Sequence, residues 1–150
     1  MRSIKSFTLL ILFCLLFMAL TGCRNSYSDF KKYHILKKEM FTQDDDEYYI
    51  YIYSTTCTVC KQIEEEVVDY ANKAIKDSSY INIYFLNLGD KINNSGIKCA
   101  TNETCDMDFL GADSYAKVKI QGPPCLIKIK DGKVVSIFDG KTKIKNQLAL

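Results

Sequence analysis

Two cysteines three residues apart, Cys57 and Cys60, lie between an apolar segment and an amphipathic one. The segment before them, residues 48–53, is aromatic and β-branched with no polar face, which predicts a strand covered on both sides. After Cys60, apolar residues recur at helical spacing, which predicts an amphipathic helix. The expected buried face of that helix consists of Ile63, Val67, Tyr70, Ala71, Ala74 and Ile75. A cysteine pair between a predicted strand and a predicted helix is the feature of this sequence that most restricts the folds the chain can adopt.

The rest of the chain completes an α/β pattern. A second apolar strand is predicted over residues 81–88, so the first half forms a βαβ unit with a right-handed crossover. Two further strands flank Asp131-Gly132, a dipeptide typical of tight hairpins, and a short helix closes the chain. Upstream, residues 27–43 predict a helix, with room for a short strand before it. We therefore expect a central mixed β-sheet, βαβ plus ββα, flanked by helices.

The N-terminus has the layout of a signal peptide. Arg2 and Lys5 precede an apolar run over residues 7–20, and small residues follow it. The alternative, a membrane-spanning anchor, needs about 20 apolar residues, more than this run supplies. The sequence "LTGC", which ends at Cys23, resembles the lipobox of bacterial lipoproteins. That resemblance implies a signal peptide over 1–22, acylation of Cys23, a lipidated tether over 23–32 and a domain over 33–150.

The charge balance argues against nucleic acid as a partner. The chain has 20 basic and 18 acidic residues, and removal of residues 1–22 takes away Arg2 and Lys5 and leaves 18 of each. A neutral protein without a basic patch has no electrostatic footprint for nucleic acid. The remaining length suits one small domain. We expect no cofactor and no metal, because a metal site would need further ligands at recognisable spacing.

The order of elements and the cysteine pair resemble the thioredoxin fold over residues 48–150. A second stretch, "VKIQGPPCLIKIKDGKVV", is similar to the family's cis-proline, strand and glycine hairpin, and counting back from Gly132 places Pro124 at the cis-proline position. The resemblance extends to extracytoplasmic lipoproteins of Gram-positive bacteria, some of which are bacteriocin-secretion accessories. It implies a membrane-anchored thiol-disulfide oxidoreductase outside the cytoplasm, acting on protein thiols or disulfides and served by a membrane redox partner.

The resemblance assigns the roles at the cysteine pair. Cys57 is the expected nucleophile, because a helix N-terminus lowers a thiol pKa from about 8.5 to between about 3.5 and 7.5. Cys60, one turn inside, is the expected resolving thiol. Thr56, Pro123 and Pro124 are the expected substrate-binding residues. The direction of exchange stays open.

Three positions depart from the family pattern. Thr56 replaces the usual Trp before the first cysteine, Tyr51 replaces a buried Asp, and Phe85 stands where its Lys partner is expected. Proton transfer from Cys60 must then use water or a nearby hydroxyl, which favours a slower, partner-specific exchanger. Pro123 also has no backbone N–H, the group that in this family normally donates a hydrogen bond to an extended substrate. A substrate should therefore bind less tightly here or in a different orientation.

Cys14 lies within the expected signal peptide, so three cysteines of the mature chain remain. Cys99 and Cys105 predict a structural disulfide in an oxidising compartment, the alternatives being a second redox pair or two free thiols. Cys125 is either a small core residue opening a strand or a third active-site thiol. Two other functions also stay open. One is a copper or zinc carrier using the same cysteines, and the other is a non-catalytic secretion accessory with this fold.

Overall fold

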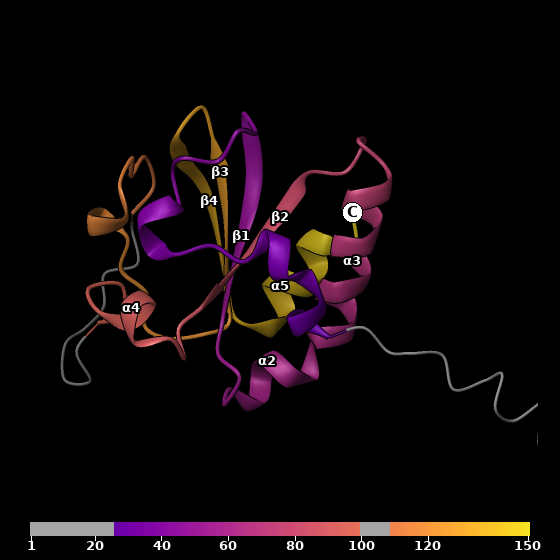
Figure 1. Ribbon diagram of the computed structural model, residues 1–150, viewed down its shortest axis with the longest axis horizontal. Helices are drawn as coiled ribbons and strands as arrows, with labels where there is room; N and C mark the ends of the chain where they lie inside the picture. The colour runs from indigo at the N-terminus through magenta and orange to yellow at the C-terminus, as the bar shows by residue number, and fades with distance from the viewer. Residues whose placement is uncertain (1–25, 100–108) are drawn as a thin grey trace, which may run out of the picture.

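The computed structural model describes residues 26–99 and 109–150, arranged around a four-stranded sheet (Figure 1). The strands are β1 (Glu47–Tyr53), β2 (Asn82–Asn87), β3 (Cys125–Lys130) and β4 (Lys133–Asp139), in the spatial order β2-β1-β3-β4. β1 runs parallel to β2 and antiparallel to β3, and β3 runs antiparallel to β4. The predicted mixed sheet, built from a βαβ and a ββα half, is confirmed.

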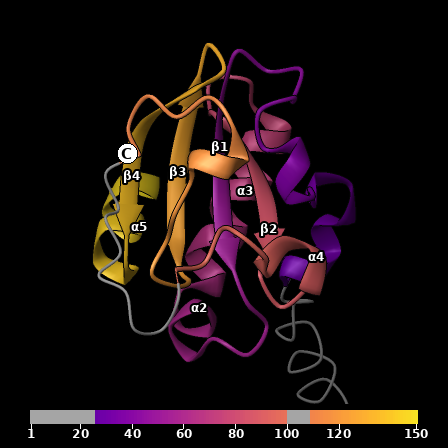
Figure 2. The same ribbon diagram turned by 90° about the vertical axis from the view of Figure 1, so that its left-hand side faces the viewer.

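Strand β1 is apolar after Glu47, and both of its faces are buried there. Its alternate residues Tyr49, Tyr51 and Tyr53 enter one core cluster, and Tyr48, Ile50 and Ile52 enter another. The first cluster lies under the helices α2 (Thr58–Gln62), α3 (Glu64–Lys76) and α5 (Lys141–Leu148). The second lies on the other face of the sheet. Figure 2 shows the short helix α4 (Lys91–Asn94) and the 3-10 turn η3 (Tyr115–Lys117) in front of that face.

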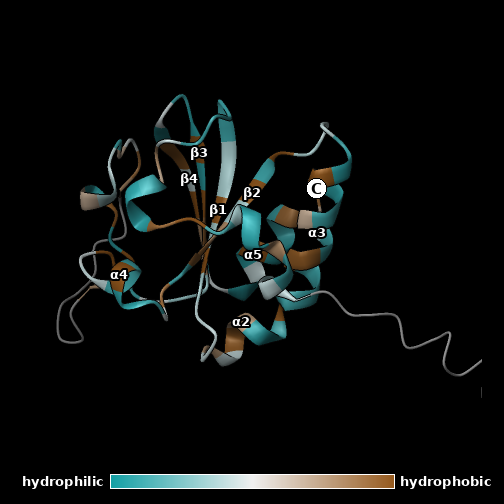
Figure 3. Cartoon of the chain, viewed as in Figure 1, coloured by the Kyte–Doolittle hydropathy of each residue, from teal (hydrophilic) through white to brown (hydrophobic). Residues whose placement is uncertain are grey.

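The crossover from β1 to β2 is two helices rather than one. Ile63, between α2 and α3, has φ −116° and ψ 11°, which interrupts the predicted helix one turn after Cys60. Figure 3 shows hydrophobic residues on only part of the α3 surface, as expected of an amphipathic helix. One predicted member of the buried face is wrong: Ile75, in the last turn of α3, is 47% exposed.

The hairpin between β3 and β4 forms at the predicted dipeptide. Asp131 has φ 49° and Gly132 has φ 70°. A two-residue hairpin with both central residues in the left-handed region matches the twist of the strands, and Asp-Gly is a favoured pair for it. The turn therefore pairs Lys130 with Lys133, and the register shifts between Lys128 and Ile129 further along β3.

The N-terminal segment differs most from prediction. Instead of one helix it forms two 3-10 turns, η1 (Tyr27–Tyr33) and η2 (Lys37–Glu39). Between them His34 bridges to Phe85, and the Ile35 amide donates to the Phe85 carbonyl at 3.0 Å. β2 is an edge strand, and exposed edges attract unwanted pairing, so this segment protects it.

Two residues of the predicted tether belong to the core. Tyr27 is 6% exposed and Phe30 is 5% exposed, and both pack in the cluster under the helices. Burial of these rings favours the observed path, with η1 pressed against the sheet, over a solvated linker or a continuous helix. The folded domain therefore starts before residue 33.

The link from β2 to β3 covers the other face of the sheet with little regular structure. A bridge joins Lys98 to Ile120. Asn93 is buried, accepts from the Lys37 amide at 2.9 Å and donates to the Asn87 carbonyl at 3.1 Å. This side chain joins α4 to the N-terminal segment and to the end of β2. None of the helices in the described part of the chain is long and apolar enough to cross a membrane.

Candidate active site

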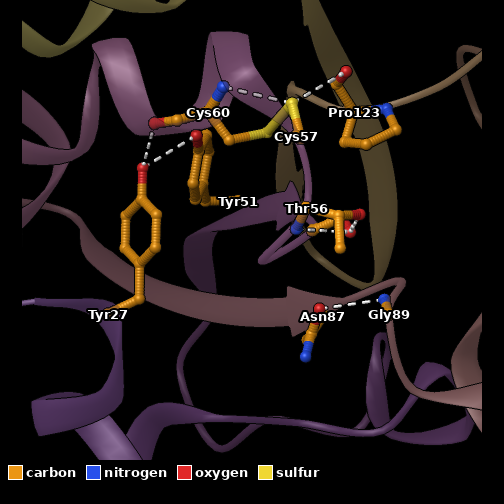
Figure 4. The surroundings of a disulfide bond; sticks show 9 residues. Tyr27, Tyr51, Thr56, Cys57, Cys60, Asn87, Gly89 and Pro123 are labelled. Atoms are coloured by element: carbon orange, nitrogen blue, oxygen red, sulfur yellow. Dashed lines mark hydrogen bonds between the residues drawn. A yellow bond between two sulfur atoms is a disulfide. The ribbon is translucent and has the colours of Figure 1, made fainter.

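Cys57 and Cys60 form a disulfide at the start of α2, directly after the turn that follows β1 (Figure 4). Their Cα atoms lie 5.2 Å apart. Cys57 is the N-cap of α2, with extended backbone, and its Sγ accepts from the Cys60 amide at 3.1 Å. Sulfur therefore takes the place of the oxygen that usually caps a helix, next to amides that have no intrahelical partner.

The two sulfurs differ in access. Cys60 is fully buried and packs among the aromatic residues of β1, whereas Cys57 is partly exposed. Val59, between them, is 39% exposed. A partner sulfur can therefore approach Cys57 and not Cys60, which is the asymmetry that attack by one thiol and resolution by another requires.

The loop before β3 lies against the same sulfur. The peptide bond between Pro123 and Pro124 is cis, and the Pro123 carbonyl oxygen lies 3.5 Å from Cys57 Sγ. Thr56 precedes Cys57 on an exposed turn, where its hydroxyl and that of Ser54 are 3.0 Å apart. The structure thus brings the predicted residues of the cysteine pair and the proline loop together, with Thr56 at the rim.

Tyr51 and Tyr27 lie beneath Cys60, and the sequence did not indicate that Tyr27 belongs to this site. The Tyr27 hydroxyl donates to the Cys60 carbonyl at 2.8 Å, and the Tyr27 and Tyr51 hydroxyls are 3.1 Å apart (Figure 4). Burial raises the pKa of both phenols well above the usual value near 10. Both therefore stay protonated at neutral pH. The apolar spacing of Tyr27 and Phe30 is the signal that could have marked this segment as part of the fold.

A hollow of about 440 Å³ adjoins the site on the side of β2 and η1. It is lined in part by Tyr27, His34, Tyr53, Lys61 and Glu64. His34 Nε2 lies 3.3 Å from the Tyr53 hydroxyl, and burial is the main cause of a lowered pKa for this imidazole. At neutral pH the ring is therefore neutral, and its role here is packing and hydrogen bonding to Tyr53.

Cys125 lies on the far side of the sheet from the redox pair. It is fully buried, pairs with Ile52 across β1 and belongs to the cluster opposite the helices. Burial, and secondarily Asp139, raises the pKa of its thiol to about 12. The structure favours the core interpretation of Cys125 over a third active-site thiol.

The other cysteine predictions fall partly or wholly outside the described residues. Cys23, the predicted lipidation site, and Cys105 are both outside them. Cys99 takes part in a disulfide. Its predicted pairing with Cys105 stays a prediction. Within residues 26–99 and 109–150, no three His, Cys, Asp or Glu side chains are grouped so as to hold a metal ion.

No protein-family model and no curated protein matches the chain. Among solved structures, thioredoxin f2 of Chlamydomonas reinhardtii is similar, with a TM-score of 0.52 and 16% identity over 77% of this chain and 89% of that one. The short form of spinach chloroplast thioredoxin f has a TM-score of 0.50 and 15% identity, over 77% and 87% of the two chains. At such identity the likeness concerns the fold alone. The chain thus has a thioredoxin fold that carries a CxxC disulfide, Cys57–Cys60, at the start of the first helix after β1.

Proposed function

We propose that this protein is a thiol-disulfide oxidoreductase that exchanges disulfides with other proteins, anchored by lipid to the outer face of the cell membrane. The observation that carries the proposal is the pairing of a partly exposed Cys57, capping a helix, with a buried Cys60, under the carbonyl of Pro123. A purely structural crosslink needs neither the helix start nor the difference in access.

The exchange takes two balanced steps. In the reduced protein, the Cys57 thiolate attacks a partner disulfide, a mixed disulfide forms, and one partner sulfur leaves as a thiolate. Cys60, as a thiolate, then attacks Cys57 Sγ and releases the second partner sulfur. Two electrons pass to the partner and the Cys57–Cys60 disulfide is left. The same steps in reverse oxidise a partner dithiol.

The surroundings of Cys60 bear on the rate. Tyr51 and Tyr27, with pKa values raised by burial, hold their protons and provide no base for the Cys60 thiol. That proton then passes to water or to another nearby hydroxyl, a slower route than transfer to a buried carboxylate positioned for the purpose. This supports a partner-specific exchanger rather than a fast general reductase.

Partner proteins follow from the same chemistry. A thioredoxin f2 that is similar to this chain, with a TM-score of 0.50 and 16% identity over 77% of this chain and 88% of that one, was solved in complex with ferredoxin:thioredoxin reductase. For the present chain we propose clients with thiols or disulfides outside the cytoplasm and a membrane protein that resets the pair. This chain resembles extracytoplasmic thioredoxin-like proteins, some of which are accessories for bacteriocin secretion.

The anchor is the second part of the proposal. The basic start, short apolar run and "LTGC" support cleavage before Cys23 and acylation of its sulfur. Diacylglycerol brings two chains, and stable anchoring takes two such signals. Cys23→Ala should give unprocessed or released protein. Wild-type protein that is soluble in the medium and carries no lipid mass would refute this part.

Cys60→Ala is the test of the enzymatic part. This variant should still attack, and without its resolving thiol it should accumulate mixed disulfides with client proteins. The further change Cys57→Ala should abolish them. Cys125→Ala is the matched control, because it removes a thiol on the opposite face and should leave trapping unchanged. If Cys60→Ala traps no partner and Cys57 alkylates like an ordinary thiol, the enzymatic reading fails.

The carrier alternative has less support from the geometry. A copper or zinc site built from Cys57, Cys60 and Cys125 would need three sulfurs on one side of the sheet, and Cys125 belongs to the core cluster on the other side. Metal content of protein purified under reducing conditions tests that alternative. Turnover of a scrambled disulfide substrate separates the oxidoreductase from a non-catalytic accessory.

A further inference from the structure

Tyr27 reaches from the N-terminal segment to the junction between α2 and α3, where it makes contacts at both ends of the residue. Its hydroxyl donates to the Cys60 carbonyl at 2.8 Å, and its backbone amide donates to Glu64 Oε1 at 3.1 Å. Its ring centroid lies 4.6 Å from that of Tyr53. The last residue of β1 and the residues on either side of the helix break are thus all in contact with Tyr27, through its ring, its hydroxyl and its backbone amide.

The carbonyl that Tyr27 binds lies at the break itself. In a continuous α-helix the Cys60 carbonyl would accept from the amide four residues on. Here it accepts from the Ile63 amide three residues on, at 3.3 Å, and from the Tyr27 hydroxyl. A hydroxyl has one proton to donate, and Tyr27 donates it to this carbonyl. In the hydrogen bond between the two tyrosines, Tyr51 is therefore the donor and Tyr27 the acceptor. The order of donation is therefore Tyr51, Tyr27, Cys60.

The same residue, Cys60, holds the sulfur of Cys57. Its amide donates to Cys57 Sγ at 3.1 Å. In the oxidised protein the covalent crosslink keeps these two residues in place. After reduction the crosslink is gone, and the orientation of the Cys60 backbone depends on noncovalent contacts, among them the hydrogen bond that the Tyr27 hydroxyl donates from outside the helices.

We propose that Tyr27 is a positioning residue for the redox centre: it holds the Cys60 backbone so that its amide stays directed at the Cys57 sulfur in the reduced protein. Hydrogen bonds to a charged acceptor are stronger than those to a neutral one, so this amide stabilises the Cys57 thiolate. The proposal rests on the redox role of Cys57 and Cys60. It assigns no proton transfer to Tyr27, whose buried phenol keeps its proton.

Tyr27→Phe removes the hydroxyl and keeps the ring. The Cys60 amide is still present in this variant, but its orientation is less restrained, so the Cys57 thiolate loses only part of its stabilisation. We therefore expect Cys57 of the reduced protein to alkylate about threefold more slowly near neutral pH. Loss of thiolate stabilisation favours the disulfide. In a glutathione redox buffer, two electrons and two protons pass between the cysteine pair and two glutathione molecules. The equilibrium constant of the full chain in this buffer should shift about threefold toward the disulfide, which corresponds to about 14 mV in reduction potential.

Tyr48→Phe is the matched control. Tyr48 is also buried, and its hydroxyl also donates to a backbone carbonyl at 2.8 Å, that of Met40, on the opposite face of the sheet. Both variants should show a similar fall in the urea midpoint. Only Tyr27→Phe should change the redox equilibrium and the alkylation rate.

Tyr51→Phe refines the test, because it removes a hydroxyl from the same chain and leaves the bond from Tyr27 to Cys60. Its redox equilibrium should stay closer to wild type than that of Tyr27→Phe. Equal redox equilibria for Tyr27→Phe and Tyr48→Phe, or faster alkylation in Tyr27→Phe, would overturn the proposal. The glutathione equilibrium needs no protein client, so a failure to trap clients would refute the proposed function and leave this result standing.

Discussion

The core of this protein is unusually rich in tyrosine, and this predicts unfolding at alkaline pH. Tyr27, Tyr48, Tyr51, Tyr53 and Tyr70 are each at most 6% exposed. Burial raises the pKa of Tyr48, Tyr53 and Tyr70 to about 12, and those of Tyr27 and Tyr51 further still. Raising the pH therefore acts on both faces of the sheet at once.

Stability should fall as the pH rises, because the phenols ionise at a lower pH in the unfolded chain than in the folded one. In the unfolded chain these phenols ionise near pH 10, so below about pH 10 both states are protonated and the full stability is present. Above it the unfolded chain releases protons that the folded chain keeps, and stability falls until the pH passes the folded pKa values. At about pH 11 each phenol costs about 1.4 kcal/mol, or about 7 kcal/mol for five. That is within the 5–15 kcal/mol range typical of domain stability.

Circular dichroism and tyrosinate absorbance, recorded on the same samples as the pH is raised, test this prediction. The circular dichroism and the part of the tyrosinate absorbance that comes from these five buried phenols should change together in one cooperative step between about pH 10 and about pH 12. Tyr48→Phe is informative here as well, because it lowers stability at neutral pH and removes one ionising group, so its deficit should shrink at about pH 11. Complete ionisation of all ten tyrosines near pH 10 with unchanged circular dichroism would refute the reasoning.

Three further predictions concern side chains outside the redox pair. Cys125→Ala should cost about 1 kcal/mol in urea unfolding and leave disulfide exchange unchanged, and native Cys125 should resist alkylation; loss of exchange with the fold intact would restore its role as a third thiol. Replacing Cys99 and Cys105 with Ser should lower stability by roughly 2 to 3 kcal/mol by the chain-entropy model and spare exchange, and a crosslinked peptide should appear in mass spectrometry of the oxidised protein. A loss of exchange as large as that of a Cys57 variant would mean that the loop pair is catalytic. Asn93→Ala should cost about 2 to 3 kcal/mol in urea unfolding, because it leaves two backbone groups without their partner, and a change below about 0.5 kcal/mol would contradict that account.

Much of the fold was predictable because its signals are local. The apolar run of β1, the helical spacing after Cys60 and the Asp131-Gly132 turn each report on a short stretch of chain. Together with the cysteine pair they suffice for the mixed sheet and for the position of Pro124. Ile75 was misplaced because helical spacing gives the side of a helix but not where the covering sheet ends.

The N-terminal segment was not predictable on the same basis. Its short 3-10 turns carry no long period, and its position depends on contacts with Cys60 and Phe85, distant in sequence. The same limit applies to Cys125. Alternation along β3 assigns it to one face of the sheet only once the register with β1 is known, and the register is a property of the assembled sheet.

The aromatic residues beneath α2 explain why this segment is part of the core. Tyr51 and Phe85 stand where the resemblance implies a buried Asp and its Lys partner. These two aromatic side chains present an apolar wall beneath α2, and burying such a wall under further apolar residues is favourable. Phe30 supplies it with a ring centroid 5.3 Å from that of Phe85, and Tyr27 lies 5.9 Å from Phe85 and 5.5 Å from Tyr51. The packed N-terminal segment thus covers this wall and brings with it a pair of buried hydroxyls, Tyr27 and Tyr51, that keep their protons at neutral pH.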